Sequence, residues 1–88
     1  MRHTSHPDII KRLKRAEGHL HTVIGMIEHD RPCVDLAQQL HAVEKAIGEA
    51  KKRLIQDHID HCLDATLKTA RGNRHGLLTE FKTISAYL

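Results

Sequence analysis

Apolar residues recur at intervals of four and three positions along two stretches of this chain. This spacing keeps apolar side chains on one face of a helix and is typical of helices that pack against other helices. Polar and charged residues fill most positions between them. The pattern therefore predicts two amphipathic helices. Their apolar stripes consist of Ile9, Leu13, Ala16, Leu20, Val23 and Ile27 in the first and of Leu36, Leu40, Val43, Ile47, Ala50 and Leu54 in the second.

Local signals place the ends of the first predicted helix at about residues 6 and 28. Pro7 falls in the first turn, where a missing N–H costs no hydrogen bond. Ser5 and Asp8 have the spacing of a capping box, in which two side chains bind unpaired backbone N–H groups. The segment 1–6 is expected to form a flexible N-terminal arm.

The second predicted helix runs from about residue 33 to residue 70. The break before it covers residues 29–32, which place a proline near the first helical position. A Gly–Asn pair within residues 71–73 favours the left-handed conformation that ends helices. A third, short helix is expected over residues 77–88, with Leu77, Phe81, Ile84 and Leu88 on one face. The chain shows no strand pattern, so the expected fold is all-α.

The length of the chain bears on its assembly. Its 88 residues suffice for a single domain, residues 1–88, and contain one Phe, one Tyr and no Trp. A domain of this size buries a marginal core by itself. The second predicted helix is also too long to be covered by the other two. We therefore expect it to pair antiparallel with the same helix of a second subunit.

Composition limits the classes of function. The formal net charge of +3 permits nucleic-acid binding without requiring it. No apolar run has the length of a signal peptide or a transmembrane helix. Two reduced cysteines fit a cytoplasmic protein. No acid–base pair or activated nucleophile stands out, so an enzyme is not expected.

Cys33, His58 and Cys62 have the residue types and spacing of a metal site. His58 and Cys62 are four positions apart and share a helical face, and thiolate and imidazole bind soft or borderline transition metals. Cys33 lies 25 positions before His58, which is about 37 Å along one helix. Two antiparallel copies related by an axis near Ile47 can join ligands that one chain cannot. The spacing therefore predicts a metal site across a dimer interface, with His61 either a neighbour of a ligand or a solvated residue.

Several segments match motifs of one protein family. Residues 12–20, RLKRAEGHL, resemble the motif RLKR-x-x-GQ, and residues 33–40 resemble the start of that family's second helix. Residues 58–62 resemble the motif H-x-x-H-C of copper sensors. The chain thus resembles the CsoR/RcnR family of small all-α bacterial metal-sensing repressors. Residues 3–7 and 42–46 make it most similar to the NreA-like nickel-resistance branch.

The resemblance implies a flat tetramer that is a dimer of dimers. It implies a metal site with Cys33 from one subunit and His58 and Cys62 from its partner, in agreement with the spacing. It also implies a transcriptional repressor that binds double-stranded operator DNA without metal and releases it when metal binds. In nickel- and cobalt-sensing relatives an N-terminal histidine completes the site. His3 is the first candidate for that role and His6 the second, the alternative being a free arm.

The number of ligands bears on the identity of the metal. Cys33, His58 and Cys62 alone form a set of two sulfurs and one nitrogen that suits Cu(I). Addition of His3 gives two sulfurs and two nitrogens, which suits Ni(II) when planar and Zn(II) or Co(II) when tetrahedral. The N-terminal histidines favour nickel(II), with copper(I) as the next candidate.

Basic residues outside the apolar stripes are the candidate DNA contacts. The resemblance places three of them on the DNA-facing surface, whereas two on the second helix fit either DNA contacts or a solvated face. Glu44 and Glu49 depart from the family, in which basic residues occur near these positions, and they weaken phosphate contacts there. The five candidates are Arg12, Lys14, Arg15, Lys51 and Lys52.

Two other functions remain open at this point. Cys33 alone would serve a thiol-based sensor of aldehydes or persulfides. Glu44 and Glu49 also fit a metal-binding accessory protein that has lost DNA binding. The remaining histidines are expected on the surface: His19, His21, His29, His41 and His75.

Overall fold

The computed structural model describes the backbone of residues 5–68 and 74–88 and the side chains of residues 5–61 and 76–88. Within these ranges the chain is all-α, as predicted, and contains no strand. Its three helices are α1 (His6–Glu28), α2 (Cys33–Lys68) and α3 (Arg74–Ser85). No helix among the described residues is long and apolar enough to cross a membrane.

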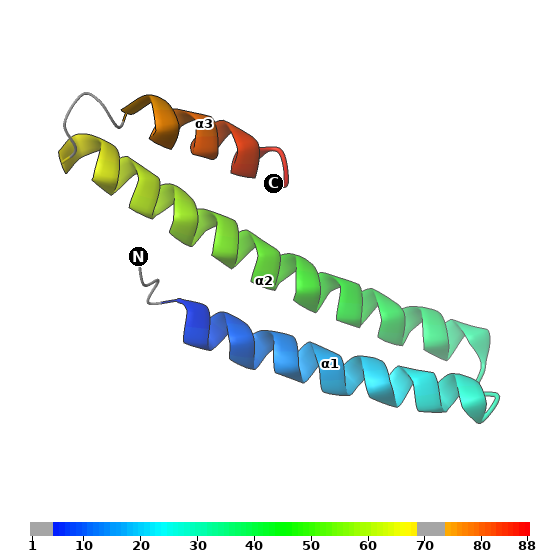
Figure 1. The fold of residues 1–88 in the computed structure, drawn as a ribbon. Helices are drawn as coiled ribbons and strands as arrows, with labels where there is room; N and C mark the ends of the chain where they lie inside the picture. Colours follow the sequence, from blue (N-terminus) through cyan, green and yellow to red (C-terminus); the bar gives the residue numbers. More distant parts are fainter. Residues whose placement is uncertain (1–4, 69–73) are drawn as a thin grey trace.

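Helix α2 is the central element of an elongated molecule. Helix α1 runs antiparallel along the first part of α2, and α3 folds back along its other end (Figure 1). The principal extents are 60 × 23 × 13 Å. As a result, the start of α1 lies near the middle of α2, whereas α3 covers the C-terminal part of α2.

The start of α1 differs from the predicted capping box. Ser5 is the N-cap residue, but its side chain makes no capping hydrogen bond. Its backbone is helical, with φ −81° and ψ −17°, whereas a capping serine needs an extended conformation to aim its oxygen at the following N–H groups. The carboxylate of Asp8 instead accepts a hydrogen bond from Arg12 Nε at 3.0 Å.

The turn between α1 and α2 is built on a left-handed aspartate. Asp30 has φ 54°. Its N–H donates to the carbonyl of Ile27, and the N–H of Arg31 donates to the carbonyl of Met26, both at 3.1 Å. These two bonds form a Schellman motif, which usually places Gly at the left-handed position. The predicted break after α1 is therefore confirmed, and its closing residue is a non-glycine residue under steric strain.

We expect Asp30→Gly to stabilise the fold. Glycine adopts the left-handed conformation without the Cβ clash that Asp30 carries, so the free energy of unfolding should rise by up to about 1 kcal/mol. Chemical denaturation with chelator at fixed protein concentration measures the change. The matched control is Asp35→Gly in the first turn of α2, which should destabilise by about 0.5 kcal/mol. Destabilisation by both substitutions would contradict the strain at Asp30.

Each chain buries only one row of its predicted apolar stripes. In α1 the buried row is Ile9, Ala16 and Val23, and in α2 Val43 and Ala50 are buried together with Ile55. Of the other stripe residues, Leu36 is half-buried and the rest are exposed. We call six of them the outer row, which has side chains 39–51% exposed and consists of Leu13, Leu20, Ile27, Leu40, Ile47 and Leu54.

Helix α3 begins and ends three residues before the predicted positions. Leu77, Phe81 and Ile84 are half-buried, as the predicted stripe requires. The stripe does not extend to Leu88, which is 73% exposed. Here the chain leaves the α-helix, because the amides of residues 86–88 donate to carbonyls three residues back, at 3.1–3.3 Å. The predicted end of the second helix, residues 70–73, lies outside the described residues.

Candidate metal centre and basic groove

Helix α2 is unbroken between Cys33 and His58, so it holds these two candidate ligands far apart. Its 25-residue separation corresponds to about 37 Å. Cys33 lies beside the α1–α2 turn, and His58 lies where α3 packs. The structure therefore does not bring them together in one chain. The described part of the chain contains no group of three or more His, Cys, Asp or Glu residues that could hold a metal ion.

Cys33 is the first residue of α2 and is exposed, with a free thiol. It follows Pro32, whose carbonyl accepts the first hydrogen bond of the helix from the Leu36 N–H at 3.1 Å. This arrangement fixes the backbone of Cys33 at a rigid helix start while its side chain remains open to a second molecule. Cys62 lies on α2, but its side chain is outside the described residues, as is all of His3.

The His58 imidazole is positioned by α3. Its Nε2 lies 3.2 Å from Glu80 Oε1, and the His58 side chain is 21% exposed. A carboxylate beside a histidine restricts the orientation of the ring, which is how outer carboxylates support metal-bound histidines. Imidazole is a transition-metal ligand, so His58 could supply one ligand of a site that is completed from elsewhere. Glu80 is a candidate site residue that sequence analysis missed, because its approach depends on how α3 folds back.

The start of α1 lies close to the candidate ligands on α2. Ser5 shares a surface cavity of about 240 Å³ with Asp57 and Asp60. His6, the first residue of α1, is half-buried. His61 is also half-buried, and its Nε2 lies 3.6 Å from Asp57 Oδ1. These contacts place the end of the predicted N-terminal arm within one or two helical turns of His58.

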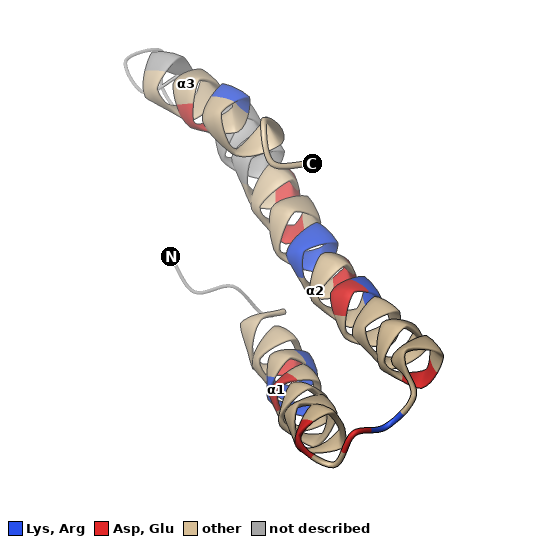
Figure 2. Ribbon diagram, turned by 90° about the vertical axis from the view of Figure 1, so that its right-hand side faces the viewer, with Lys and Arg blue, Asp and Glu red and all other residues tan. Residues whose placement is uncertain are grey.

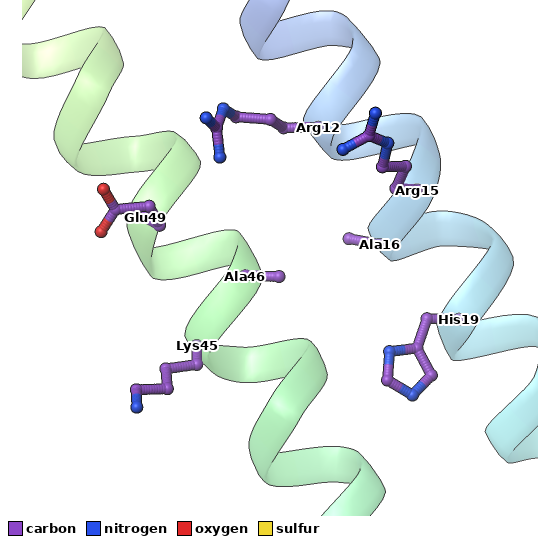
Figure 3. A pocket seen from close by; sticks show the side chains of 7 residues that line it. All are labelled: Arg12, Arg15, Ala16, His19, Lys45, Ala46 and Glu49. Carbon is purple, nitrogen blue, oxygen red and sulfur yellow. The ribbon is translucent and has the colours of Figure 1, made fainter.

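An open groove of about 440 Å³ runs between α1 and α2, and we call it the basic groove. Figure 3 shows Arg12 reaching from α1 into the space between the helices. Small side chains, Ala16 and Ala46, leave room for it. The full lining is Arg12, Arg15, Ala16 and His19 from α1 and Lys45, Ala46 and Glu49 from α2.

The groove separates the five predicted DNA contacts into two groups. Arg12 and Arg15 line it, whereas three exposed lysines lie outside its lining: Lys14, Lys51 and Lys52. Lys45 lines the groove although it was not among the predicted contacts. Figure 2 shows the basic residues of both helices interleaved with acids along the hairpin. The basic residues that share one surface, Arg12, Arg15 and Lys45, therefore come from both helices and are brought together by the groove.

Two ion pairs modify the charges of this surface. The Arg12 guanidinium donates a hydrogen bond to Asp8 and lowers the pKa of that carboxyl below its ordinary 3.8, against an opposing effect of burial. Asp8 therefore remains ionised at neutral pH and partly neutralises Arg12. On α2, Arg53 Nε lies 3.6 Å from Glu49 Oε1. Both pairs are solvent-exposed and add little stability.

His19 is the exception among the histidines expected on the surface. His21, His29 and His41 are exposed as predicted, and His75 lies outside the residues with described side chains. His19 is half-buried, and its Nε2 lies 2.6 Å from Gln39 Oε1, which makes a hydrogen bond between α1 and α2. The family motif has Gln at this position, and that was the available signal that the residue is a polar inter-helix contact.

The chain is similar in sequence to known copper-sensing repressors. The chain is 38% identical over 66 residues to the copper-sensing transcriptional repressor CsoR of Bacillus subtilis. The matched segment covers 75% of this chain and 65% of that protein. It is 32% identical over 78 residues to the copper-sensing repressor RicR of Mycobacterium tuberculosis, covering 89% and 81% of the two chains. The match to CsoR thus spans slightly less than two thirds of that relative.

A solved structure has the same fold. The nickel-responsive transcriptional regulator InrS superposes with a TM-score of 0.84 at 28% identity, over 99% of this chain and 96% of the other. The family described as metal-sensitive transcriptional repressors, which are not enzymes, matches residues 5–86. Sequence, fold and family match therefore agree, and this chain belongs to the CsoR/RcnR family of metal-sensitive transcriptional repressors.

Proposed function

We propose that this protein is a metal-responsive repressor that binds operator DNA without metal and releases it when nickel(II), cobalt(II) or copper(I) binds. The metal site takes Cys33 from one subunit and His58 and Cys62 from the partner. The observation that carries this proposal is the unbroken α2, which separates Cys33 from His58 within a chain. A second subunit is then the simplest source of the missing thiolate.

The outer row supports the second subunit. Six large apolar side chains of α1 and α2 remain exposed in the single chain. On each helix they recur every seven residues and so share one face, and exposed apolar side chains that gather on one face mark an interface. An antiparallel copy related by an axis near Ile47 would cover the outer row and set its Cys33 opposite His58. Two such sites would form in one dimer.

Metal binding would reach the DNA surface through helix packing. His58 contacts Glu80 of α3, and α2 also forms one wall of the basic groove. A bound metal would favour one packing of α2 against its neighbours. DNA affinity would then change by the difference in metal affinity between the two packings, since the two equilibria are linked.

We expect Glu80→Gln to weaken metal binding by roughly 10- to 100-fold, because it removes the charge that orients His58. The same variant should release DNA only at higher metal concentration. Competition with a chelator measures the metal affinity, and fluorescence anisotropy measures the DNA affinity. Lys82→Gln, a neutralisation at the exposed end of α3, is the control and should behave as wild type. Equal effects of the two substitutions would remove Glu80 from the site.

The arm provides the test of the metal. Ser5 is held beside Asp57 and Asp60, and two further residues reach about 7 Å, which supports His3 as a ligand. Anaerobic titration with Ni(II) and with Cu(I), followed by absorption and by DNA anisotropy, compares wild type with His3→Ala. A thiolate-to-Ni(II) band that is lost in the variant, with DNA release by Ni(II), supports a nickel sensor. Cu(I)-driven release that does not depend on His3 supports a copper sensor.

The exposed thiol of Cys33 favours a second candidate, a thiol-based sensor. In that case an aldehyde or a persulfide would release DNA from the metal-free protein, and a chelator would not prevent the release. The same anisotropy assay distinguishes the two. A third candidate, the accessory protein without DNA binding, is favoured by Glu49 in the groove. It predicts no salt-dependent binding to DNA in any metal state.

A further inference from the structure

Glu44 and Lys51 alternate with residues of the outer row along α2. Glu44 lies four residues after Leu40 and three before Ile47. Lys51 lies four residues after Ile47 and three before Leu54. Residues at these spacings are neighbours on the surface of a helix. Both charged side chains are exposed, so one acid and one base flank the outer row on the same face of α2.

Neither side chain has a partner of opposite charge in its own chain. Acids and bases on one helix pair at spacings of three or four residues. No Lys or Arg lies at these spacings from Glu44, and no Asp or Glu lies at them from Lys51. The ion pairs among the described residues include neither of the two. Both also lie outside the lining of the basic groove between α1 and α2. Two opposite charges are therefore available to a molecule that covers the outer row.

We propose that Glu44 of each subunit pairs with Lys51 of the other, and that these two ion pairs fix how the α2 helices of a dimer align. This inference rests on the dimer of the proposed function, and the partner that the residues fit is a second copy of this chain. Residues with a common midpoint lie opposite each other in an antiparallel pair of helices. The two cysteines, Cys33 and Cys62, have their midpoint between residues 47 and 48. Glu44 and Lys51 have the same midpoint, so the axis that shares the metal ligands also forms both ion pairs.

The same two residues disfavour other alignments of the two helices. A parallel pairing in register sets each residue level with its own copy, Glu44 with Glu44 and Lys51 with Lys51. An antiparallel pairing that slips by seven residues keeps the outer rows in contact, because they repeat every seven residues. A slip in one direction brings Lys51 opposite Lys51, and a slip in the other direction brings Glu44 opposite Glu44. Charges beside the apolar seam of paired helices set partner choice and orientation, and repulsion excludes the competing arrangements.

Charge reversal tests the pairing in metal-free protein without DNA. Glu44→Lys and Lys51→Glu each place like charges at both pair positions of a dimer, and the loss of two exposed ion pairs should weaken self-association roughly 2- to 30-fold. An equal mixture of the two variants regains two opposite-charge pairs in each mixed dimer and should associate as wild type does. Sedimentation equilibrium measures both effects. A mixture that associates as weakly as the separate variants would overturn the inference.

The matched control is Lys52→Glu. It changes the net charge as Lys51→Glu does, but Lys52 lies about 140° around the helix from Ile47. It should associate as wild type does, and its mixture with Glu44→Lys should show no recovery. Equal weakening by Lys52→Glu and Lys51→Glu would mean that net charge alone acts, which would also overturn the inference.

A zero-length cross-linker tests the contact itself. Carbodiimide joins a carboxylate to an amine that touches it, and an equal mixture of ¹⁴N- and ¹⁵N-labelled wild-type chains separates links between subunits from links within one. A peptide that joins Glu44 of one isotope to Lys51 of the other supports the pair, and its absence overturns the pair. Such a link in a protein that binds neither metal nor DNA would count against the repressor alone. A missing link leaves the shared metal site to be judged by mixing of ligand variants.

Discussion

Replacement of Cys33 with Ala is expected to abolish tight metal binding and to leave a helical oligomer of unchanged size. Loss of the thiolate, a direct ligand, should lower the metal affinity more than roughly 100-fold, which is the upper end of the loss for residues that only support a ligand. Because Cys33 is exposed at the start of α2, the substitution should change the free energy of unfolding by less than about 0.5 kcal/mol. Chelator competition, circular dichroism and sedimentation measure the three properties.

A mixing experiment makes this prediction specific to a shared site. Cys33→Ala and His58→Ala chains each lack one ligand, so neither homodimer has an intact site. A mixed dimer pairs the Cys33 of one chain with the His58 and Cys62 of the other and regains one site of two. After full exchange about half of the dimers are mixed, so recovery of about a quarter of the wild-type metal sites supports the shared site. No restoration after exchange of subunits, or an unfolded Cys33→Ala chain, would contradict it.

Substitution of Ile47 by Asp is expected to separate the subunits. Ile47 lies in the outer row, 45% exposed in the single chain, and close to the proposed two-fold axis. A carboxylate there would be buried against the same carboxylate of the partner, at a cost of several kcal/mol. A domain of this size is marginal alone, so the variant should form partly unfolded monomers. Sedimentation velocity and thermal melting followed by circular dichroism measure both effects.

The control for Ile47→Asp is Val34→Asp. Val34 is also on α2 and 69% exposed, but it lies outside the apolar stripe. Its substitution should leave the oligomer and the melting temperature nearly unchanged. Metal binding should be lost with the oligomer in Ile47→Asp, because each site needs two chains. An Ile47→Asp protein that stays oligomeric and binds metal would place the axis elsewhere.

The fold could largely be predicted because helix spacing is a local property. The bounds of α1 and the start of α2 match the prediction, since Pro7 and Pro32 sit where the apolar pattern begins. The capping box failed because the backbone of Ser5 remains helical. The end of α3 was placed too late because Leu88 fits the heptad spacing, whereas its final turns have tighter hydrogen bonds. Spacing alone does not report that change.

The sequence could predict how the candidate site residues are arranged along one helix, but not which residues of different helices lie side by side. The distance between Cys33 and His58 follows from their positions on one helix. The approach of Glu80 to His58 and the presence of Lys45 and Glu49 in the groove depend on how helices align side by side. His19 was misplaced for the same reason, because its partner Gln39 comes from another helix. The ligand assignments themselves remain predictions.

Because α2 is unbroken, the number of residues between Cys33 and His58 fixes both their distance and their relative orientation around the helix. Each residue inserted in a helix rotates everything beyond it by about 100° and advances it by about 1.5 Å. One extra residue would therefore turn His58 away from the face it shares with the apolar stripe. A seven-residue insertion would keep the face and lengthen both ligand separation and interface together. Insertions and deletions should accordingly be tolerated in the arm, the α1–α2 turn and the C-terminal end. The number of residues between Cys33 and His58 should stay constant.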